Sequence, residues 1–527
     1  MKQLFYNGKI LTMADPLYVE ALLTENDKIL ATGAKEELLA LAPDCELVDL
    51  KGKALLPGFI DPHSHFAAVA NALLRASLEE ATSVEEIRDR VQAFIKKKNL
   101  QPGEWICALN YDNNLLPDEK NPTLEQLDWI CPDHPLMISH KSGHMGLVNS
   151  MAMEKLGITV DTPSPEGGRI GKENGKLTGY LEENAFFAYM TKAGTVDFNQ
   201  LMESMDDTQD LYASYGITTV QEGLLMKDLL PLYEAFAPMK KLKLDVMLYA
   251  DPGLYEKTEE VLKKAGEPHL HLCGIKVLLD GSPQGRTAWT RQPYEGSDDY
   301  CAYGTLTDED LEKAFIFAGE HKTQLLAHCN GDGASEQYLN CLERAEKKVP
   351  WLAESRPVII HGQLMGRDQM PRAAKLGAMV SFFVAHVYHW GDIHIKNFGM
   401  ERAKHISAAR TALDCGVKFT FHQDCPVLEP DMMETVWCAV NRITRKGVHL
   451  GSDEESISTL EALKAITVNG AYQYFAEDRI GTLEPGKQAD MVMLEQDPLD
   501  TPKEELNKVK VLRTYKNGAC IYSCDKQ

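Results

Sequence analysis

The chain has 527 residues, with 55 Lys and Arg against 78 Asp and Glu and a formal net charge of −23. This length exceeds one ordinary domain, so we expect several domains or one large barrel with insertions. The acidic excess is spread along the whole chain, which argues against nucleic acid as a partner.

No apolar run reaches the roughly 20 residues that cross a bilayer. The opening MKQLFYNGKILTM lacks the long apolar stretch of a signal peptide. The twelve cysteines form no C-x-x-C pair, which argues against a disulfide framework and against zinc knuckles. We therefore expect a cytoplasmic protein that does not bind membranes.

Both ends of the chain carry short β-prone runs with turn residues. Near the N-terminus, QLFYNGKILTM places Asn7-Gly8 between two such runs and predicts a hairpin, and a second hairpin follows around Glu25 to Lys28. Near the C-terminus, VKVLRTYKNGACIY predicts a hairpin at Asn517-Gly518, after the strand-like ADMVMLEQDP. Because isolated hairpins cannot bury both faces, we expect a small β-sandwich domain built from residues 1–55 and 481–527.

Eight apolar runs of strand length occur in between, most of them followed by a segment compatible with a helix. This alternation predicts an α/β fold, a distorted (β/α)8 TIM barrel over residues 56–480. A long insertion, at about 67–210, separates the first barrel strand from the second. The runs are ALLPGFI, GITTVQEG, LKLDVMLYA, GIKVLLDG, TQLLAHCN, RPVIIHG, AMVSFFVA and VKFTFHQD.

Five of the eight runs carry residues that can bind metal, most of them at or just after the carboxyl end, where barrel enzymes place their catalytic groups. Imidazole and carboxylate are the ligands of a hydrolytic zinc-like site. In extended backbone, residues i and i+2 point the same way, so His63 and His65 can hold one ion together. The residues are Asp61, His63 and His65 after the first run, Lys276 in the fourth, His328 in the fifth, His361 in the sixth and Asp424 in the eighth.

Each of these residues also has a structural interpretation. His63 and His65 could be solvated loop residues, and His328 and His361 could be core imidazoles with satisfied hydrogen bonds. Asp424 could cap a helix or accept a proton from metal-bound water. Lys276 could reach the barrel rim, or burial could lower its pKa so that carbon dioxide converts it to a carbamate.

As a set, these residues resemble the amidohydrolase superfamily. The motifs SGHMGLVNS, DGSPQGRTAW, AHCNGDGA, HVYHWGD, FHQDCPV and IGTLEPGKQADMVMLEQDP resemble its YtcJ-like branch, which includes N-substituted formamide deformylases. The resemblance implies one or two divalent metals, usually zinc, and hydrolysis of an amide or related C–N bond in a small-molecule substrate. By position it implies these metal ligands: His63, His65, Lys276 as a carbamate, His328, His361 and Asp424, which would also shuttle protons.

Further residues are candidates for contact with the substrate. His144 lies in a motif similar to one that reaches into the site of the branch, and it could donate a hydrogen bond to the substrate carbonyl or its oxyanion. Arg286 and Trp289 follow the strand that carries Lys276 and could line the pocket. Tyr388, His389, Trp390 and Asp392 could do the same after the seventh strand.

The mechanism we expect uses metal-bound hydroxide to attack the carbonyl, with Asp424 as proton acceptor and donor. Two alternatives stay open. One is a deaminase of an aminated heterocycle on the same barrel, although AHCNGDG has no Glu one turn after His328. The other is a metal-poor binding or scaffold protein. Because two-fold dimers are the commonest oligomers of soluble enzymes, a homodimer is the oligomeric state we expect.

Overall fold

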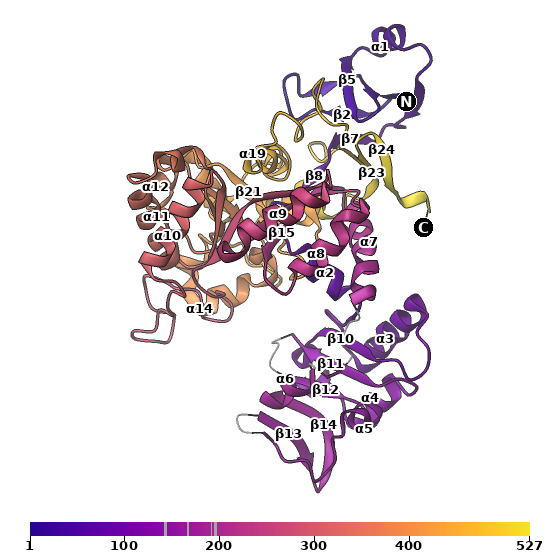
Figure 1. Cartoon of the computed structure of the whole chain (residues 1–527), viewed down its shortest axis with the longest axis vertical. Coiled ribbons are helices and arrows are strands. Elements are labelled where there is room, and N and C mark those ends of the chain that lie inside the picture. Colours follow the sequence, from indigo (N-terminus) through magenta and orange to yellow (C-terminus); the bar gives the residue numbers. More distant parts are fainter. Residues whose placement is uncertain (142–144, 166–167, 191, 194–197, 527) are drawn as a thin grey trace. The chain divides into compact units, whose positions relative to one another are not determined.

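A computed structural model of the chain describes residues 1–141, 145–165, 168–190, 192–193 and 198–526. The chain divides into two compact units, which are described separately. Unit 1 comprises Met1–Ala67 and Gln209–Gln527, and unit 2 comprises Ala68–Thr208 (Figure 1). None of the described helices is long and apolar enough to span a bilayer.

Unit 1 is built around a curled eight-stranded sheet in which every strand pairs in parallel with its neighbours. Each of the eight predicted runs overlaps one of these strands. The first run is split, because its Ala54–Pro57 part forms β7 in a different sheet. The strands, in order across the sheet, are β8 (Phe59–Ile60), β15 (Ile217–Leu225), β16 (Asp245–Ala250), β17 (Leu270–Leu278), β18 (Gln324–Cys329), β19 (Val358–His361), β20 (Met379–Phe382) and β21 (Phe419–Phe421).

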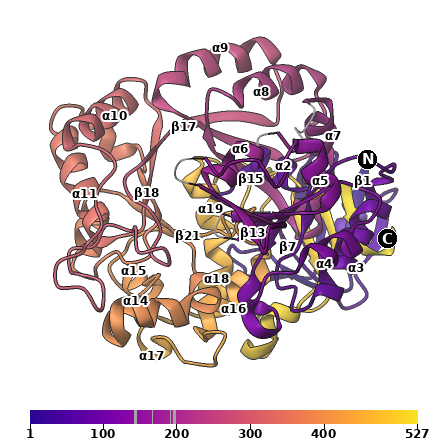
Figure 2. The ribbon, with the colours of Figure 1, turned by 90° about the horizontal axis from the view of Figure 1, so that it is seen from below.

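Helices follow most of these strands, as the alternating pattern predicts. Figure 2 shows α9, α10, α11 and α14 outside the strands β17, β18 and β21. One buried cluster joins strand residues such as Ile60, Met247 and Ile360 to Ala471 and Ile480 near the last helix. The helices are α8 (Leu230–Phe236), α9 (Tyr255–Ala265), α10 (Asp308–Glu320), α11 (Asp332–Glu346), α12 (Met370–Lys375), α13 (His386–His389), α14 (Gly391–Ala403), α15 (Ala409–Asp414), α16 (Met432–Asn441), α17 (Ser452–Glu455), α18 (Thr459–Ala465) and α19 (Val468–Gln473).

Two further sheets of unit 1 are made from the chain ends. Phe5 and Leu22 of the first sheet and Met491 and Tyr515 of the second belong to one hydrophobic cluster, so the sheets share a core. The four-stranded sheet has the order β5 (Lys28–Gly33), β4 (Ala21–Glu25), β1 (Lys2–Tyr6), β6 (Glu46–Asp49). The six-stranded sheet has the order β24 (Ala519–Ser523), β23 (Val511–Lys516), β22 (Met491–Leu494), β7, β2 (Lys9–Leu11), β3 (Tyr18–Val19).

Two of the three predicted hairpins form, and one does not. The hairpins β4–β5 and β23–β24 are confirmed as antiparallel pairs. The hairpin at Asn7-Gly8 is wrong, because β1 and β2 lie in different sheets. The turn instead carries the chain from one sheet to the other, and a Cβ on Gly8 would lie 2.4 Å from the Lys53 carbonyl oxygen. Burial against partners far along the chain therefore outweighed the local turn preference.

Unit 2 contains its own six-stranded sheet and two hydrophobic clusters. Asn149 of the SGHMGLVNS motif has a structural role there. Its side chain accepts hydrogen bonds from Leu136 N and Ala152 N and donates to the carbonyls of Cys131 and His134, each at 2.9 Å. The sheet order is β13 (Gly168–Glu173), β14 (Lys176–Glu183), β12 (Met145–Val148), β11 (Leu136–His140), β10 (Ile106–Tyr111), β9 (Ala76–Ser77), with helices α3 (Val84–Lys98), α4 (Leu124–Ile130), α5 (Ser150–Leu156) and α6 (Asn184–Met190).

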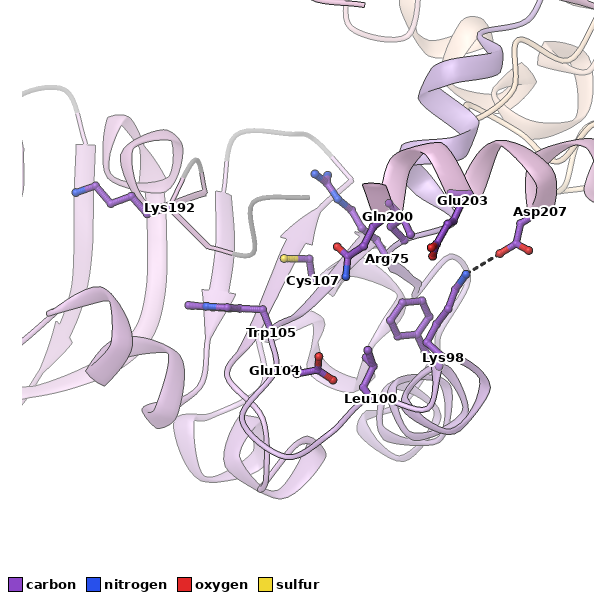
Figure 3. Close-up of a pocket in the computed structure, with 13 residues that line it drawn as sticks. Arg75, Lys98, Leu100, Glu104, Trp105, Cys107, Lys192, Gln200, Glu203 and Asp207 are labelled. Carbon is purple, nitrogen blue, oxygen red and sulfur yellow. Dashed lines mark hydrogen bonds and ion pairs between the residues drawn. The ribbon is translucent and has the colours of Figure 1, made fainter. Parts of the chain in front are cut away.

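A cavity of about 550 Å³ lies within unit 2 (Figure 3). Its lining combines apolar side chains such as Phe94 and Trp105 with charged ones, among them Lys98. Lys98 is paired with Asp207 at 2.8 Å. None of the residues predicted for metal binding lines this cavity.

Candidate active site

The carboxyl ends of the parallel strands bring the predicted metal ligands to one place in unit 1. Asp424, just after β21, lies between three imidazoles. Its Oδ1 is 3.4 Å from His63 Nε2 and 3.4 Å from His65 Nε2, and its Oδ2 is 3.9 Å from His361 Nε2. One ligand atom each from His63, His361 and Asp424 lie within 4.8 Å of one another. Two imidazoles and a carboxylate at this spacing can hold a divalent cation.

The carboxylate of Asp424 is held in its charged form. Burial opposes ionisation, but the neighbouring side chains of His65, His63 and His361 outweigh it and keep the pKa of Asp424 well below its ordinary value. Its Oδ1 is nevertheless buried without a hydrogen-bond partner. An ionised, buried and unsatisfied oxygen is costly unless a cation binds it, which fits a metal site.

The orientation of His63 follows from Gln221 on β15. The Gln221 amide donates through Nε2 to the Pro62 carbonyl at 2.7 Å and to the Tyr474 hydroxyl at 3.0 Å. Its Oε1 is therefore free to accept, and it lies 2.7 Å from His63 Nδ1. His63 must then carry its proton on Nδ1, so that the lone pair of Nε2 points toward Asp424 and is available to a metal.

His65 is held between two carboxylates. Its Nδ1 lies 4.0 Å from Glu222 Oε1. Burial by itself would lower the pKa of His65, but the nearby carboxylates of Asp424 and Glu222 have the larger effect and raise it. Glu222 accepts hydrogen bonds from Ala67 N at 2.8 Å and from the Tyr233 hydroxyl at 2.6 Å. These bonds fix Glu222 beside His65.

His361 ends β19, and its Nδ1 lies 3.1 Å from His422 Nε2. The second nitrogen of His422 lies 2.7 Å from the hydroxyl of Ser381 on β20. His361, His422 and Ser381 are all almost fully buried. His361 therefore has a neutral imidazole as its neighbour, whereas His65 has a carboxylate.

His328 is placed differently from the other predicted ligands. Its ring lies 4.6 Å from that of His361, but both of its nitrogens have protein partners. Nδ1 lies 3.2 Å from Asp280 Oδ1, and Nε2 lies 3.3 Å from the amide nitrogen of Asn330. Asp280 is itself held by the backbone amides of Trp289, Asn330 and Gly331. In this conformation His328 would have to release one partner before it could bind a metal.

Lys276 lies in β17 with 2% of its surface exposed. Its Nζ is buried without a hydrogen-bond partner. Burial lowers the pKa of Lys276 to about 7, although Asp424 and Cys329 oppose the shift. An unpaired amine at this position needs an explanation, because burying a charged lysine without a partner is expensive.

The predicted substrate contacts are only partly brought to the site. His144 lies outside the described residues. The Trp390 ring packs 5.9 Å from that of Phe383, which lies 5.3 Å from His422.

The other candidates make the following contacts within the protein. Arg286 donates to the Glu295 carbonyl, and the Trp289 backbone holds Asp280. Tyr388 packs against Trp437, His389 pairs with Glu434 at 3.0 Å, and Asp392 accepts a hydrogen bond from Thr444.

Comparison with known proteins identifies the chain. The model of the amidohydrolase family matches residues 46–522. The chain belongs to the amidohydrolase family. The amidohydrolase superfamily, predicted from the strand-end residues, is thus confirmed.

Relatives match this amidohydrolase over nearly its whole length. The N-substituted formamide deformylase of Arthrobacter pascens is 26% identical over 521 residues, 95% of each chain. The putative amidohydrolase YtcJ of Bacillus subtilis is 26% identical over 543 residues, 99% of each chain. The crystal structure of an uncharacterized metal-dependent hydrolase from Pyrococcus horikoshii has a TM-score of 0.76 at 25% identity and covers 95% of this chain and 99% of its own. Together with the family match, these relatives indicate a hydrolase that acts on C–N bonds.

Four residues at the amidohydrolase site were not among the predicted candidates: Gln221, Glu222, Asp280 and His422. His422 could have been found, because it stands two residues before Asp424 and the i, i+2 argument that joins His63 to His65 applies to it as well. Gln221 and Glu222 lie inside a predicted strand, and the pattern of residues along that strand does not indicate which side chains they contact. Their roles depend on contacts between strands far apart in the sequence.

Proposed function

We propose that this protein hydrolyses an amide or another non-peptide C–N bond, with an N-substituted formamide as the first substrate to test. The observation that carries the proposal is the close set of His63, His361 and Asp424 ligand atoms beside the unsatisfied Asp424 Oδ1. His65, 3.4 Å from the same oxygen, would complete the set. Nitrogen and oxygen donors favour zinc as the cation. The formamide is suggested by the deformylase relative.

A divalent cation at this place would polarise the substrate carbonyl and acidify a water molecule. Asp424 would accept the proton of that water as its oxygen adds to the carbonyl carbon. Asp424 would then return the proton to the nitrogen as the C–N bond breaks, so that the products are a carboxylic acid and an amine. His144 stays our proposed hydrogen-bond donor to the carbonyl oxygen.

The variant Asp424→Asn tests this role. We expect it to keep bound metal, since an amide oxygen can still ligate, and to lose about 10²- to 10⁴-fold in kcat, since an amide cannot accept the proton. The measurement is turnover of an N-substituted formamide together with metal content. Asp414→Asn, at a surface carboxylate paired with Arg410, serves as control. Full turnover in Asp424→Asn would remove Asp424 from the proposed role.

The number of metal ions, one or two, depends on whether Lys276 forms a carbamate. In the neutral form its amine can attack carbon dioxide, which forms an N–C bond and releases a proton to give a carbamate whose oxygens could bridge two ions. The engagement of both His328 nitrogens favours a single ion in the described conformation. Elemental analysis with and without Lys276→Ala separates the two arrangements.

We expect two metals that fall to one or fewer in Lys276→Ala if the carbamate forms. In that case ¹³C-labelled bicarbonate also gives a carbamate carbon signal in the parent protein. One metal that is unchanged in the variant would contradict the carbamate and leave Lys276 with a structural role.

We also propose the domain division in which residues 56–480 form a distorted (β/α)8 barrel with the insertion at about 67–210, and residues 1–55 and 481–527 form a β-sandwich. The shared hydrophobic cluster of the two terminal sheets supports this division. The parallel order of the eight strands supports the barrel. In such a barrel the carboxyl ends of the strands carry the active site, which agrees with the placement of Asp424 and the histidines.

A further inference from the structure

Ser381, His422 and His361 form a chain of hydrogen bonds that ends at a proposed metal ligand. The Ser381 hydroxyl lies 2.7 Å from His422 Nδ1, and His422 Nε2 lies 3.1 Å from His361 Nδ1. Ser381 and His422 are fully buried, and His361 is 3% exposed. Water is thus kept away from the chain, so each nitrogen depends on its protein partner.

This chain can run in two directions. In one, Ser381 donates to His422, which donates from Nε2 to His361 Nδ1. His361 then carries its own proton on Nε2, toward Asp424, and has no lone pair there for a metal. In the other, His361 donates from Nδ1 to His422, and His422 donates from Nδ1 to the Ser381 oxygen. Only this second direction leaves His361 Nε2 free to ligate.

The contrast with His63 makes the choice of direction important. The Gln221 amide is oriented by two acceptors of its own, so it allows one tautomer of His63. A histidine and a serine can each donate or accept, so His422 and Ser381 allow both tautomers of His361.

We propose that His422 and Ser381 act as a reversible acceptor relay that lets metal binding select the ligating tautomer of His361. His422 is then a positioning residue. The inference rests on the proposed metal site. When the cation is absent, the hydrogen bonds run from Ser381 toward His361; when it is bound, they run from His361 toward Ser381. Each imidazole keeps one proton throughout: it releases its Nε2 proton to solvent and takes one up on Nδ1, while the Ser381 hydroxyl keeps its proton and rotates from donor to acceptor. Groups that accept a hydrogen bond from the non-ligating nitrogen of a metal-bound histidine commonly contribute about 10- to 100-fold in metal affinity.

The first test measures zinc affinity of the full-length protein by competition with a chelator. His422→Phe removes the acceptor while keeping a planar ring, and we expect a loss of about 10- to 100-fold. His422→Gln offers an amide oxygen to His361 Nδ1 and should recover most of the affinity. Ser381→Ala keeps His422 and should show a smaller loss. His394→Phe breaks the hydrogen bond between His394 and His386, another buried histidine pair, and serves as the matched control.

The second test reads the tautomers directly. The protein is labelled with ¹⁵N-histidine, and the imidazole NMR signals of His422 are assigned as those that disappear in His422→Phe. On addition of zinc, we expect these signals to show that the proton of His422 moves from Nε2 to Nδ1. A merely structural His422 would keep one tautomer. Circular dichroism establishes that each variant is folded.

Several results would overturn the relay. Zinc binding by His422→Phe as tight as in the parent would do so while leaving the proposed function intact. A loss of one nitrogen ligand from the visible spectrum of cobalt-substituted His422→Gln, which still offers His361 an acceptor, would also do so, because His422 would then be a ligand itself. A parent protein that binds no divalent metal would instead overturn the proposed function, and the relay with it.

Discussion

His361 and Asp424 have left-handed backbone conformations, with φ of 74° and 54°. For residues other than glycine such a conformation costs about 1–3 kcal/mol and persists where the surrounding structure enforces it. Both residues lie at or just beyond the end of a strand and direct their side chains to the same small volume. Backbone strain and the proposed ligand set therefore coincide, as is common at functional sites.

The buried histidine His394 gives a prediction about pH. Burial lowers the pKa of His394 to about 3, from an ordinary value of 6.5. Because the unfolded chain takes up a proton below pH 6.5 and the folded protein does not, this group should reduce stability as the pH falls from 6.5 toward 3. Between pH 6.5 and pH 5 the loss should be about 2 kcal/mol.

The measurement is the free energy of unfolding in urea, compared between the parent and His394→Phe at pH 7 and pH 5. The variant should lose less stability on acidification than the parent. Equal losses in the two proteins would show that His394 is not buried in its neutral form.

At the level of secondary-structure elements, a buried ion cluster joins the terminal strand β23 to β16 of the eight-stranded parallel sheet. Lys516 Nζ lies 2.8 Å from Asp245 and 2.7 Å from Asp490, and all three side chains are at most 3% exposed. Burial by itself would lower the pKa of Lys516, but the two carboxylates have the larger effect and raise it. The cluster fixes how the terminal sheet attaches to the eight-stranded parallel sheet.

We expect Lys516→Met to lower the free energy of unfolding by about 3–5 kcal/mol, because it leaves two buried carboxylates without their cation. The control is Lys263→Met, which removes an exposed pair with Glu259 on α9 and should change stability by about 0.5 kcal/mol or less. Thermal or urea unfolding measures both variants. Similar small effects of the two substitutions would contradict the role of the cluster.

At the scale of the whole molecule, unit 2 has the features of an independent folding unit. Its sheet pairs only with its own strands among the described residues, and its two clusters include Ile106, Leu136 and Phe186. We expect the separate polypeptide 68–208 to unfold in one cooperative transition. Circular dichroism and tryptophan fluorescence should give coincident urea curves. A gradual change without a common midpoint would show that unit 2 needs the rest of the chain.

Much of the architecture could be predicted from local patterns. Apolar runs bounded by turn residues indicated all eight parallel strands, because a strand buried on both faces must be continuously apolar. The ligand types at their ends followed from the same pattern, since the carboxyl ends of parallel strands meet at one edge. The Asn7-Gly8 turn was misinterpreted, because turn residues specify a reversal but do not specify which strand becomes the partner.

Residue types and short spacings were enough to indicate the family of this protein, its parallel strands and the histidines and acids at their ends. Tertiary structure decided which nitrogen of each imidazole is free. Gln221 reaches His63 from another strand, and Asp280 and Asn330 occupy both nitrogens of His328. Ser381 meets His422 because β20 and β21 pair with Phe382 opposite Phe421. Such contacts arise from strand register over long separations in the chain, which no local pattern specifies.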